Sequence, residues 1–175
     1  MGFGRKGGRE ALEAEIPRLR RFARVLTRGD GARADDLVQE TLLRALGAID
    51  GFRAESGLGT WLTTIMLNVH RSEQRRQSRA RAHADREARA APAEPAEPAR
   101  QEQRLEVRET LAALEALPEE QRLAISLVSV GEMSYADAAR VLGVKLGTLM
   151  SRISRGRAAM RARLEGARSG RSGND

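Results

Sequence analysis

The chain has 175 residues, a formal net charge of +7 and no cysteine, so it is small and basic, and it cannot form disulfides or thiolate metal sites. With only two histidines, a multi-histidine metal site is excluded as well, and no cofactor is expected. The positive charge is nearly all arginine, which fits phosphates and guanine edges. An anionic partner is therefore predicted, and nucleic acid is favoured over a membrane surface.

Membrane insertion is not expected from the pattern of apolar residues. No apolar run approaches the roughly 20 residues that a spanning helix needs. The first residues, MGFGRKGGRE, lack the apolar centre of a signal peptide. We therefore expect a cytoplasmic protein.

Three helices are predicted in residues 10–76, because apolar residues recur there at steps of three and four. The breaks between them are TRGDG and the loop FRAESGLG. The helices should cover residues 11–26, about 35–49 and 60 to about 76. Their expected inner residues are, in order, Leu12, Ile16, Leu19, Ala23 and Leu26; Val38, Leu42, Ala45 and Ile49; and Leu62, Ile65, Met66 and Val69. Together they predict one compact N-terminal bundle.

Residues 77–104 are rich in Ala, Arg, Glu and Pro and have almost no large apolar residue. Prolines at 92, 95 and 98 exclude a continuous helix, although the stretch before them can be helical. The composition predicts a flexible linker that lets two domains act at well-separated sites.

Four helices are predicted in residues 105–166. Val107, Leu111 and Leu114 mark the first, and the proline and acids of PEEQ start the second. A capping box of Ser134 and Asp137 starts the third, which Gly143 ends. The fourth opens near Gly147, and the tail GARSGRSGND should be frayed. The expected inner residues of the last three helices are Leu123, Leu127 and Val130; Tyr135, Ala138, Ala139 and Leu142; and Leu149, Ile153, Gly156, Met160 and Leu164.

No strand pattern is present, so the predicted fold is all-α, with two small helical domains joined by the linker. The short helix, the glycine turn and the longer last helix are typical of a DNA-binding helix-turn-helix. From Lys145 to Arg171 there are eight basic residues and one acid, Glu165, which suits contact with phosphates. The competing interpretation is a solvated basic helix in an ordinary bundle.

Two outer rows of the N-terminal bundle are further candidates. Thr64, Asn68, Arg71 and Arg75 share one face of the third helix, where asparagine can read base edges and arginines can hold phosphates. The preceding helix presents Asp36, Gln39, Glu40 and Leu43, a combination that favours a basic protein partner. Either row can also be a plain solvated face.

An enzyme is the least favoured interpretation. Asp36 and Glu40 are four residues apart and could share a metal, but no histidine or further carboxylate converges on them. No catalytic or metal-binding residue is therefore assigned.

Several linked segments resemble the conserved parts of bacterial extracytoplasmic-function (ECF) RNA polymerase sigma factors. They are ADDLVQETLLRALGAIDGF, GTWLTTIMLNVHRSEQRR, LPEEQRLAISLV and SYADAARVLGVKLGTLMSRISRGR. The resemblance covers both predicted domains and their order. It implies an alternative sigma factor without catalytic residues, which binds core RNA polymerase and directs promoter-specific initiation of a stress or envelope response regulon.

The resemblance also implies roles for individual residues. Core-polymerase binding would fall to Asp36, Gln39, Glu40 and Leu43. Recognition and melting of the minus-10 promoter element would use the loop FRAESGLG and Arg53, Thr64, Asn68, Arg71, Arg75 and Arg76. The minus-35 element would be read as duplex by Lys145, Thr148, Ser151, Arg152 and Arg155. A cognate anti-sigma factor is the further partner that the family implies.

The alternative is a stand-alone helix-turn-helix regulator. It would leave without a role the row of Asp36, Gln39, Glu40 and Leu43 and the DNA-facing row on the third helix of the N-terminal bundle. Ser72, Lys145 and Met150 stand where many family members carry aspartate, proline and a basic residue, so the promoter sequence stays open. Met150 falls on the shoulder of the predicted buried stripe. Two roles remain for it: packing against the domain, or contact with a thymine methyl group.

Overall fold

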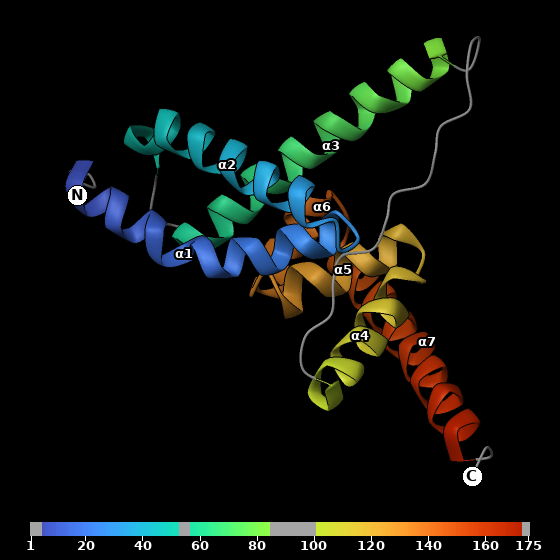
Figure 1. Ribbon diagram of the computed structural model, residues 1–175. Coiled ribbons are helices and arrows are strands. Elements are labelled where there is room, and N and C mark those ends of the chain that lie inside the picture. Colours follow the sequence, from blue (N-terminus) through green and yellow to red (C-terminus); the bar gives the residue numbers. More distant parts are fainter. Residues whose placement is uncertain (1–4, 53–56, 85–100, 173–175) are drawn as a thin grey trace. The chain divides into compact units, whose positions relative to one another are not determined.

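The structure is a computed structural model that describes residues 5–52, 57–84 and 101–172. In these ranges the regular secondary structure is helical throughout, which confirms the predicted all-α fold (Figure 1). The chain divides into two compact units, residues 1–96 and residues 97–175. Each unit is described by itself below.

The first unit contains three α-helices that pack on one another. They are α1 (Arg5–Leu26), α2 (Gly31–Ala48) and α3 (Leu58–Ala84), with a short 3-10 turn, η1 (Ile49–Gly51), after α2. Large side chains fill the space between the helices and are fully buried: Leu19, Phe22, Leu37, Leu62, Met66 and Leu67. Burial of so much apolar surface is the main source of stability for a bundle of this size.

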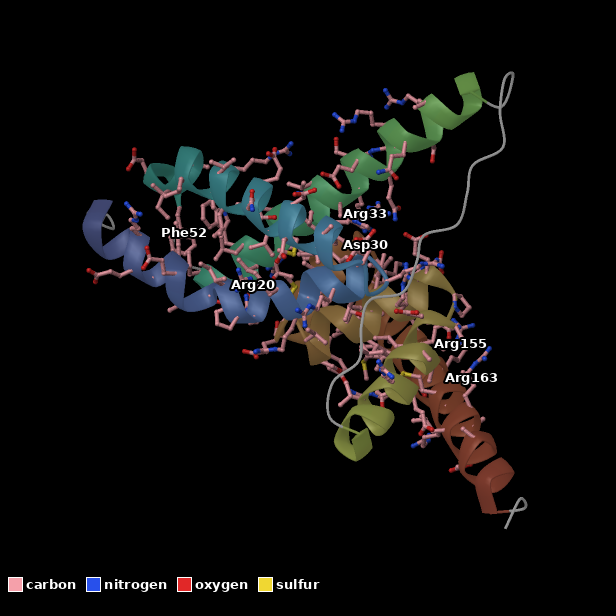
Figure 2. The ribbon with its side chains drawn as sticks, in the orientation of Figure 1. Arg20, Asp30, Arg33, Phe52, Arg155 and Arg163 are labelled. Atoms are coloured by element: carbon pink, nitrogen blue, oxygen red, sulfur yellow. The ribbon has the colours of Figure 1, made fainter. Side chains whose placement is uncertain are left out.

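α2 begins four residues earlier than the predicted start near residue 35. Asp30 caps the helix, because its carboxylate accepts a hydrogen bond from the backbone N–H of Arg33 at 3.0 Å (Figure 2). The preceding turn places Arg28 and Gly29 at positive φ, 55° and 82°. The capping residue, not the first large apolar side chain, therefore sets the start of the helix.

The predicted inner stripe of α2 was partly wrong. Val38 and Ala45 are buried as expected, but Leu42 and Ile49 are only half-buried. Leu37 and Thr41 are buried instead, and the Thr41 hydroxyl donates to the Leu37 carbonyl at 2.7 Å. A threonine can line the core here because its own helix satisfies its hydroxyl group.

The second unit contains α4 (Gln101–Glu115), α5 (Glu119–Ser129), α6 (Tyr135–Leu142) and α7 (Leu146–Ser172). α7 packs against each of the other three helices. Its inner face uses the buried Leu149, Ile153 and Gly156, as predicted. Met160 and Leu164 were also expected to point inward but are only half-buried. On α4, Leu114 is buried, whereas Val107 and Leu111 are exposed.

Three helices are longer than the sequence pattern predicts. α3 continues to Ala84 and α4 starts at Gln101, so both extend into the range expected to be linker. α7 reaches Ser172, where a frayed tail was expected. Arg and Ala are the commonest residues of these extensions, and both favour helix without a buried stripe. The prolines at 92, 95 and 98 lie outside the described residues.

Candidate nucleic-acid and protein interfaces

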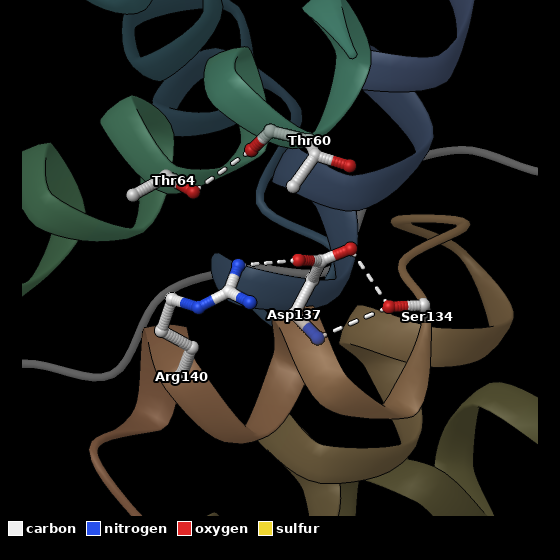
Figure 3. A network of polar contacts seen from close by, with 5 residues as sticks. All are labelled: Thr60, Thr64, Ser134, Asp137 and Arg140. Atoms are coloured by element: carbon white, nitrogen blue, oxygen red, sulfur yellow. Dashed lines mark hydrogen bonds and ion pairs between the residues drawn. The ribbon is translucent and has the colours of Figure 1, made fainter. Parts of the chain in front are cut away.

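The start of α6 is fixed by the predicted capping residues. The Ser134 hydroxyl accepts a hydrogen bond from the Asp137 N–H at 3.1 Å and donates to the Asp137 carboxylate at 2.7 Å (Figure 3). Arg140 then pairs with the same carboxylate at 2.6 Å. These contacts confirm Ser134 as the predicted cap, with Asp137 bonded to its hydroxyl and not to its backbone N–H, and they hold the first turn of α6.

The turn between α6 and α7 depends on Gly143. Its φ of 68° lies in the left-handed region, and its N–H bonds to the carbonyls of Ala139 and Arg140. The N–H of Val144 reaches the Ala139 carbonyl at 3.0 Å, which completes a Schellman-type end. A side chain at 143 would be strained, so this glycine directs the chain into α7.

The first three turns of α7, with Lys145 just before them, present a polar and basic face. Four of the residues predicted to contact DNA are exposed there: Lys145, Thr148, Ser151 and Arg155. The Arg155 Nε donates weakly to the Ser151 carbonyl at 3.4 Å, and Arg155 and Arg163 project from the helix in Figure 2. Leu146 and Met150, which are 47% and 51% exposed, lie beside this face.

Arg152 differs from these four residues. Its guanidinium pairs with Glu120 of α5 at 2.8 Å, and its side chain is only 18% exposed. The pair links α7 to the start of α5, so the structure gives Arg152 a second possible role in orienting the helix. Its contact with DNA stays a prediction.

The predicted DNA-facing row on α3 is also at the surface. Asn68, Arg75 and Arg76 are exposed, whereas Arg71 is partly buried. Thr64 is partly buried too, and its hydroxyl donates to the Thr60 carbonyl at 2.8 Å (Figure 3). The row therefore offers an amide and several guanidinium groups along one helix.

A hollow of about 450 Å³ follows this row and extends it beyond the predicted residues. It is lined by Arg71, Gln74, Arg75, Ser78 and Arg79. Arg79, four residues after Arg75, was not predicted to bind DNA, because α3 was expected to end at about residue 76. Three guanidinium groups at helical spacing give the hollow a positive potential suited to phosphate.

The entry to α3 is held by α1. The Arg18 Nη2 donates to the Thr63 Oγ1 at 3.1 Å, while its Nε pairs with Glu15 at 2.9 Å. A Cβ on Gly59 would collide with the Arg18 guanidinium, so a larger residue there would push this flexible side chain aside. Arg53, predicted to contact DNA, lies outside the described residues, as do residues 54–56 of the same loop.

Aromatic rings flank that loop. The Phe52 and Trp61 centroids are 5.0 Å apart with an interplanar angle of 44°. Tilted aromatic pairs at this distance attract each other beyond simple burial. The pair ties the residue before the loop to the first turn of α3.

The candidate protein-binding row on α2 is exposed as predicted. Asp36 and Gln39 are exposed, and Leu43 is 65% exposed, which is high for a leucine. Glu40 is partly buried and pairs with Arg44 at 2.7 Å. Leu46, 50% exposed and three residues after Leu43, enlarges the apolar part of the row. Leu46 was not among the predicted polymerase-binding residues, although its spacing of three from Leu43 puts both residues on the same face of the helix.

A groove of about 330 Å³ runs between this row and α3. Its walls carry both signs of charge, from Asp36, Glu40, Arg44, Glu73 and Arg76, together with the uncharged Ser72 and Val69. Of the α3 residues predicted to bind DNA, Arg76 borders this groove, whereas Arg71 and Arg75 line the other hollow. Within the described ranges, no three His, Asp or Glu side chains are grouped as metal ligands would be.

Of the helices in the described part of the chain, none has the length and apolarity needed to cross a membrane.

Comparison with known families matches each unit separately. Residues 11–80 match Sigma-70 region 2, and residues 108–160 match Sigma-70, region 4. These are the two helical parts of a transcription initiation factor, in the order found here.

Curated relatives extend the match over nearly the whole chain. The ECF RNA polymerase sigma factor EcfG of Rhodopseudomonas palustris is 44% identical over 156 residues, which is 89% of this chain and 84% of the relative. The ECF RNA polymerase sigma factor SigC of Mycobacterium tuberculosis is 39% identical over 166 residues, with 91% and 86% covered.

Solved structures share the fold. The sigma factor RpoE in complex with the anti-sigma factor NepR from Bartonella quintana aligns with a TM-score of 0.77 and 34% identity, over 90% of this chain and 96% of that one. CnrH in complex with the cytosolic domain of CnrY aligns with a TM-score of 0.66 and 26% identity, over 93% and 90%.

The chain belongs to the ECF RNA polymerase sigma factors of the sigma-70 family. It is an alternative sigma factor, which directs promoter-specific initiation of transcription.

Proposed function

We propose that three surfaces divide the work of this sigma factor: α2 binds core RNA polymerase, α3 recognises and melts the minus-10 element, and α7 reads the minus-35 element as duplex. The single observation that carries the proposal is the contrast between the exposed faces. α2 presents acids with two exposed leucines, whereas α3 and α7 present arginines with Asn, Ser or Thr. The two exposed apolar residues of α7, Leu146 and Met150, stand among basic and polar groups and not among acids.

The α2 surface favours a protein partner. Leu43 and Leu46 together expose an apolar area that is costly to leave in water, and Asp36 beside them would repel DNA phosphates. A basic surface of the polymerase with an apolar centre would match both features. Glu40, which forms an ion pair with Arg44, would belong to the same polymerase-binding surface.

The α3 surface favours DNA with separated strands. Asn68 can bond the edge of an unpaired base, while Arg71, Arg75 and Arg76 hold the backbone. Capture of an unstacked base offsets part of the free energy of unpairing. The Phe52–Trp61 pair and the Arg18 contact beside Gly59 would hold the flanks of the loop that receives such a base.

The α7 surface favours intact duplex. The N-terminal residues of the second helix of a helix-turn-helix enter the major groove, and here these are Lys145, Thr148 and Ser151. Arg155, one turn later, can reach a phosphate or a guanine edge. We further propose that Arg152 acts mainly by orienting α7 through Glu120.

Reconstitution with purified core RNA polymerase tests the proposal. The full chain should bind the core enzyme and produce a transcript from promoters selected out of a randomised library. A stand-alone regulator would instead protect duplex DNA without binding the core enzyme. Failure to bind the core enzyme or to yield a promoter-dependent transcript would overturn the proposed function.

An anti-sigma factor is the proposed regulatory partner. A similar solved structure is a sigma factor in complex with an anti-sigma factor, and the exposed leucines of α2 offer a surface that such a partner would cover. We place the protein in the cytoplasm, with no catalytic activity of its own, and assign it a stress or envelope response regulon. Purification from the native cell after crosslinking should recover a small partner that blocks core-enzyme binding; its absence would count against this assignment.

A further inference from the structure

Two large apolar side chains stand exposed at the start of α7. Leu146 is 47% exposed and Met150 is 51% exposed, so about half of each residue's surface is left for a partner. They are four residues apart and are therefore neighbours on the helix surface. Met150 can therefore pack partly against the domain and still contact a thymine methyl group.

Gly147 lies next to this pair, three residues before Met150. A Cβ there would meet no atom within 4 Å, and the residue is not at positive φ. Neither the backbone conformation nor the packing within the domain requires glycine here, and the open space beside it leaves room for a partner to approach the pair.

The surroundings of the pair identify the partner chemically. Lys145, Ser151 and Arg155 are exposed around it, and these groups favour an anionic and hydrogen-bonding surface. The major groove of DNA combines phosphates, base-edge donors and acceptors, and one apolar group, the 5-methyl of thymine. A hydrophobic protein surface would place two cationic side chains against apolar atoms, which is unfavourable.

We infer that Leu146 and Met150 contact thymine 5-methyl groups in the major groove and make thymine a specificity determinant of the upstream promoter element. The inference rests on the proposed duplex reading by α7. Gly147 lets the helix approach closely enough for both side chains to touch base edges. Thr148, Ser151 and Arg155 then supply the hydrogen bonds.

Deoxyuridine tests this directly, because it lacks the methyl group and keeps every hydrogen-bonding group of thymine. Holoenzyme reconstituted from the full chain and core polymerase is selected on promoters with a randomised minus-35 region, amplified with dTTP or with dUTP. Thymine should be enriched at one or two positions in the first pool, and this preference should fall in the second. Replacing that single thymine by deoxyuridine should lower promoter binding about fourfold, the effect of one buried methyl group.

Protein variants locate the contact. In Met150→Ala or Leu146→Ala, promoters with thymine and with deoxyuridine should bind nearly equally, because the thymine methyl group has lost its contact. Val107→Ala is the matched control, because Val107 is a 59% exposed apolar residue of α4. That variant should keep the fourfold penalty, and deoxyuridine in the spacer should have no effect.

The outcomes separate the inference from the proposed function. Equal binding of thymine and deoxyuridine promoters, with minus-35 preference otherwise intact, would overturn the inference alone. The same holds if Met150→Ala and Leu146→Ala both keep the full penalty, or if they weaken core-polymerase binding instead. Loss of any minus-35 preference in the unmodified protein would overturn the duplex reading as well.

Discussion

α3 and α7 are both long basic helices, yet their exposed faces differ in chemistry. The α3 row is polar throughout, with Asn68 and a series of arginines, whereas the α7 face mixes Ser, Thr and Arg with exposed Leu146 and Met150. Unpaired bases and backbone phosphates need hydrogen bonds and charge. Edges of intact base pairs also offer methyl groups. The difference shows that a basic helix alone does not define which form of DNA it binds.

The helices are also supported differently. In the first unit, large residues such as Phe22, Leu62 and Met66 fill the core around α3. In the second unit, small residues let α7 approach its neighbours closely, and a Cβ on Gly156 would lie 2.6 Å from the Ile125 Cδ1. The α7 surface therefore depends more on close backbone packing than the α3 surface does.

The largest expected effect is on this packing. Gly156→Leu should destabilise the second unit by about 1–3 kcal/mol, because the core has no space for the added side chain. Gly166→Leu is the matched control on the same helix, where a Cβ would meet nothing within 4 Å. Hydrogen exchange of the full chain should show faster exchange in α5–α7 for Gly156→Leu only. Equal exchange in both variants would contradict the packing argument.

Polymerase binding should be next in size. Leu43→Ala should weaken the affinity for core polymerase by about 1–2 kcal/mol, and Leu46→Ala by less, because each removes apolar area from the proposed interface. A pull-down titration with core enzyme measures this. Leu111→Ala, which truncates a leucine that is 39% exposed in the second unit, is the control. If all three variants bind alike, α2 is not the docking surface.

The cap of α6 should contribute less. Ser134→Ala removes the hydroxyl that accepts from the Asp137 N–H, so the second unit should lose about 1 kcal/mol of stability. Ser134→Thr should retain most of it. Urea unfolding followed by circular dichroism compares the two, and equal loss in both would show that the cap bonds are not responsible.

The smallest effect concerns single phosphates. Arg155→Ala should lower the slope of log affinity against log salt by about 0.9 if Arg155 holds one phosphate. Arg152→Ala should change this slope less, because Glu120 already pairs with that guanidinium. Binding titrations on a minus-35 duplex over a range of salt concentrations measure both. If Arg152→Ala lowers the slope more than Arg155→Ala does, Arg152 contacts a phosphate directly.

In the described part of the chain, apolar periodicity was enough to predict each α-helix and many of the buried residues, because helix packing demands that pattern. It did not predict Leu37 and Thr41 in the core of α2, since a buried threonine satisfied within its own helix looks polar in sequence. Nor could it predict the end of α3 at Ala84, where no core residue marks the boundary.

The candidate surfaces were predicted from helix faces, but contacts between distant residues were not. The Arg152–Glu120 pair joins residues on different helices, and the Arg18 contact with Thr63 joins α1 to α3. Such pairs depend on how the helices pack. The exposure of Leu146 likewise follows from that packing and not from local sequence.

The central claim is that α3 opens the minus-10 element while α7 reads intact duplex, and permanganate footprinting of holoenzyme on a selected promoter tests it most directly. Asn68→Ala should reduce thymine reactivity in the minus-10 region by about tenfold, within the 1–3 kcal/mol expected for a base contact, and leave minus-35 protection unchanged. Arg155→Ala should weaken minus-35 protection. On a template whose minus-10 region is already melted, Arg155→Ala should weaken this protection as before, whereas the defect of Asn68→Ala should be partly relieved. If both variants lose both signals equally, the proposed division between α3 and α7 is wrong.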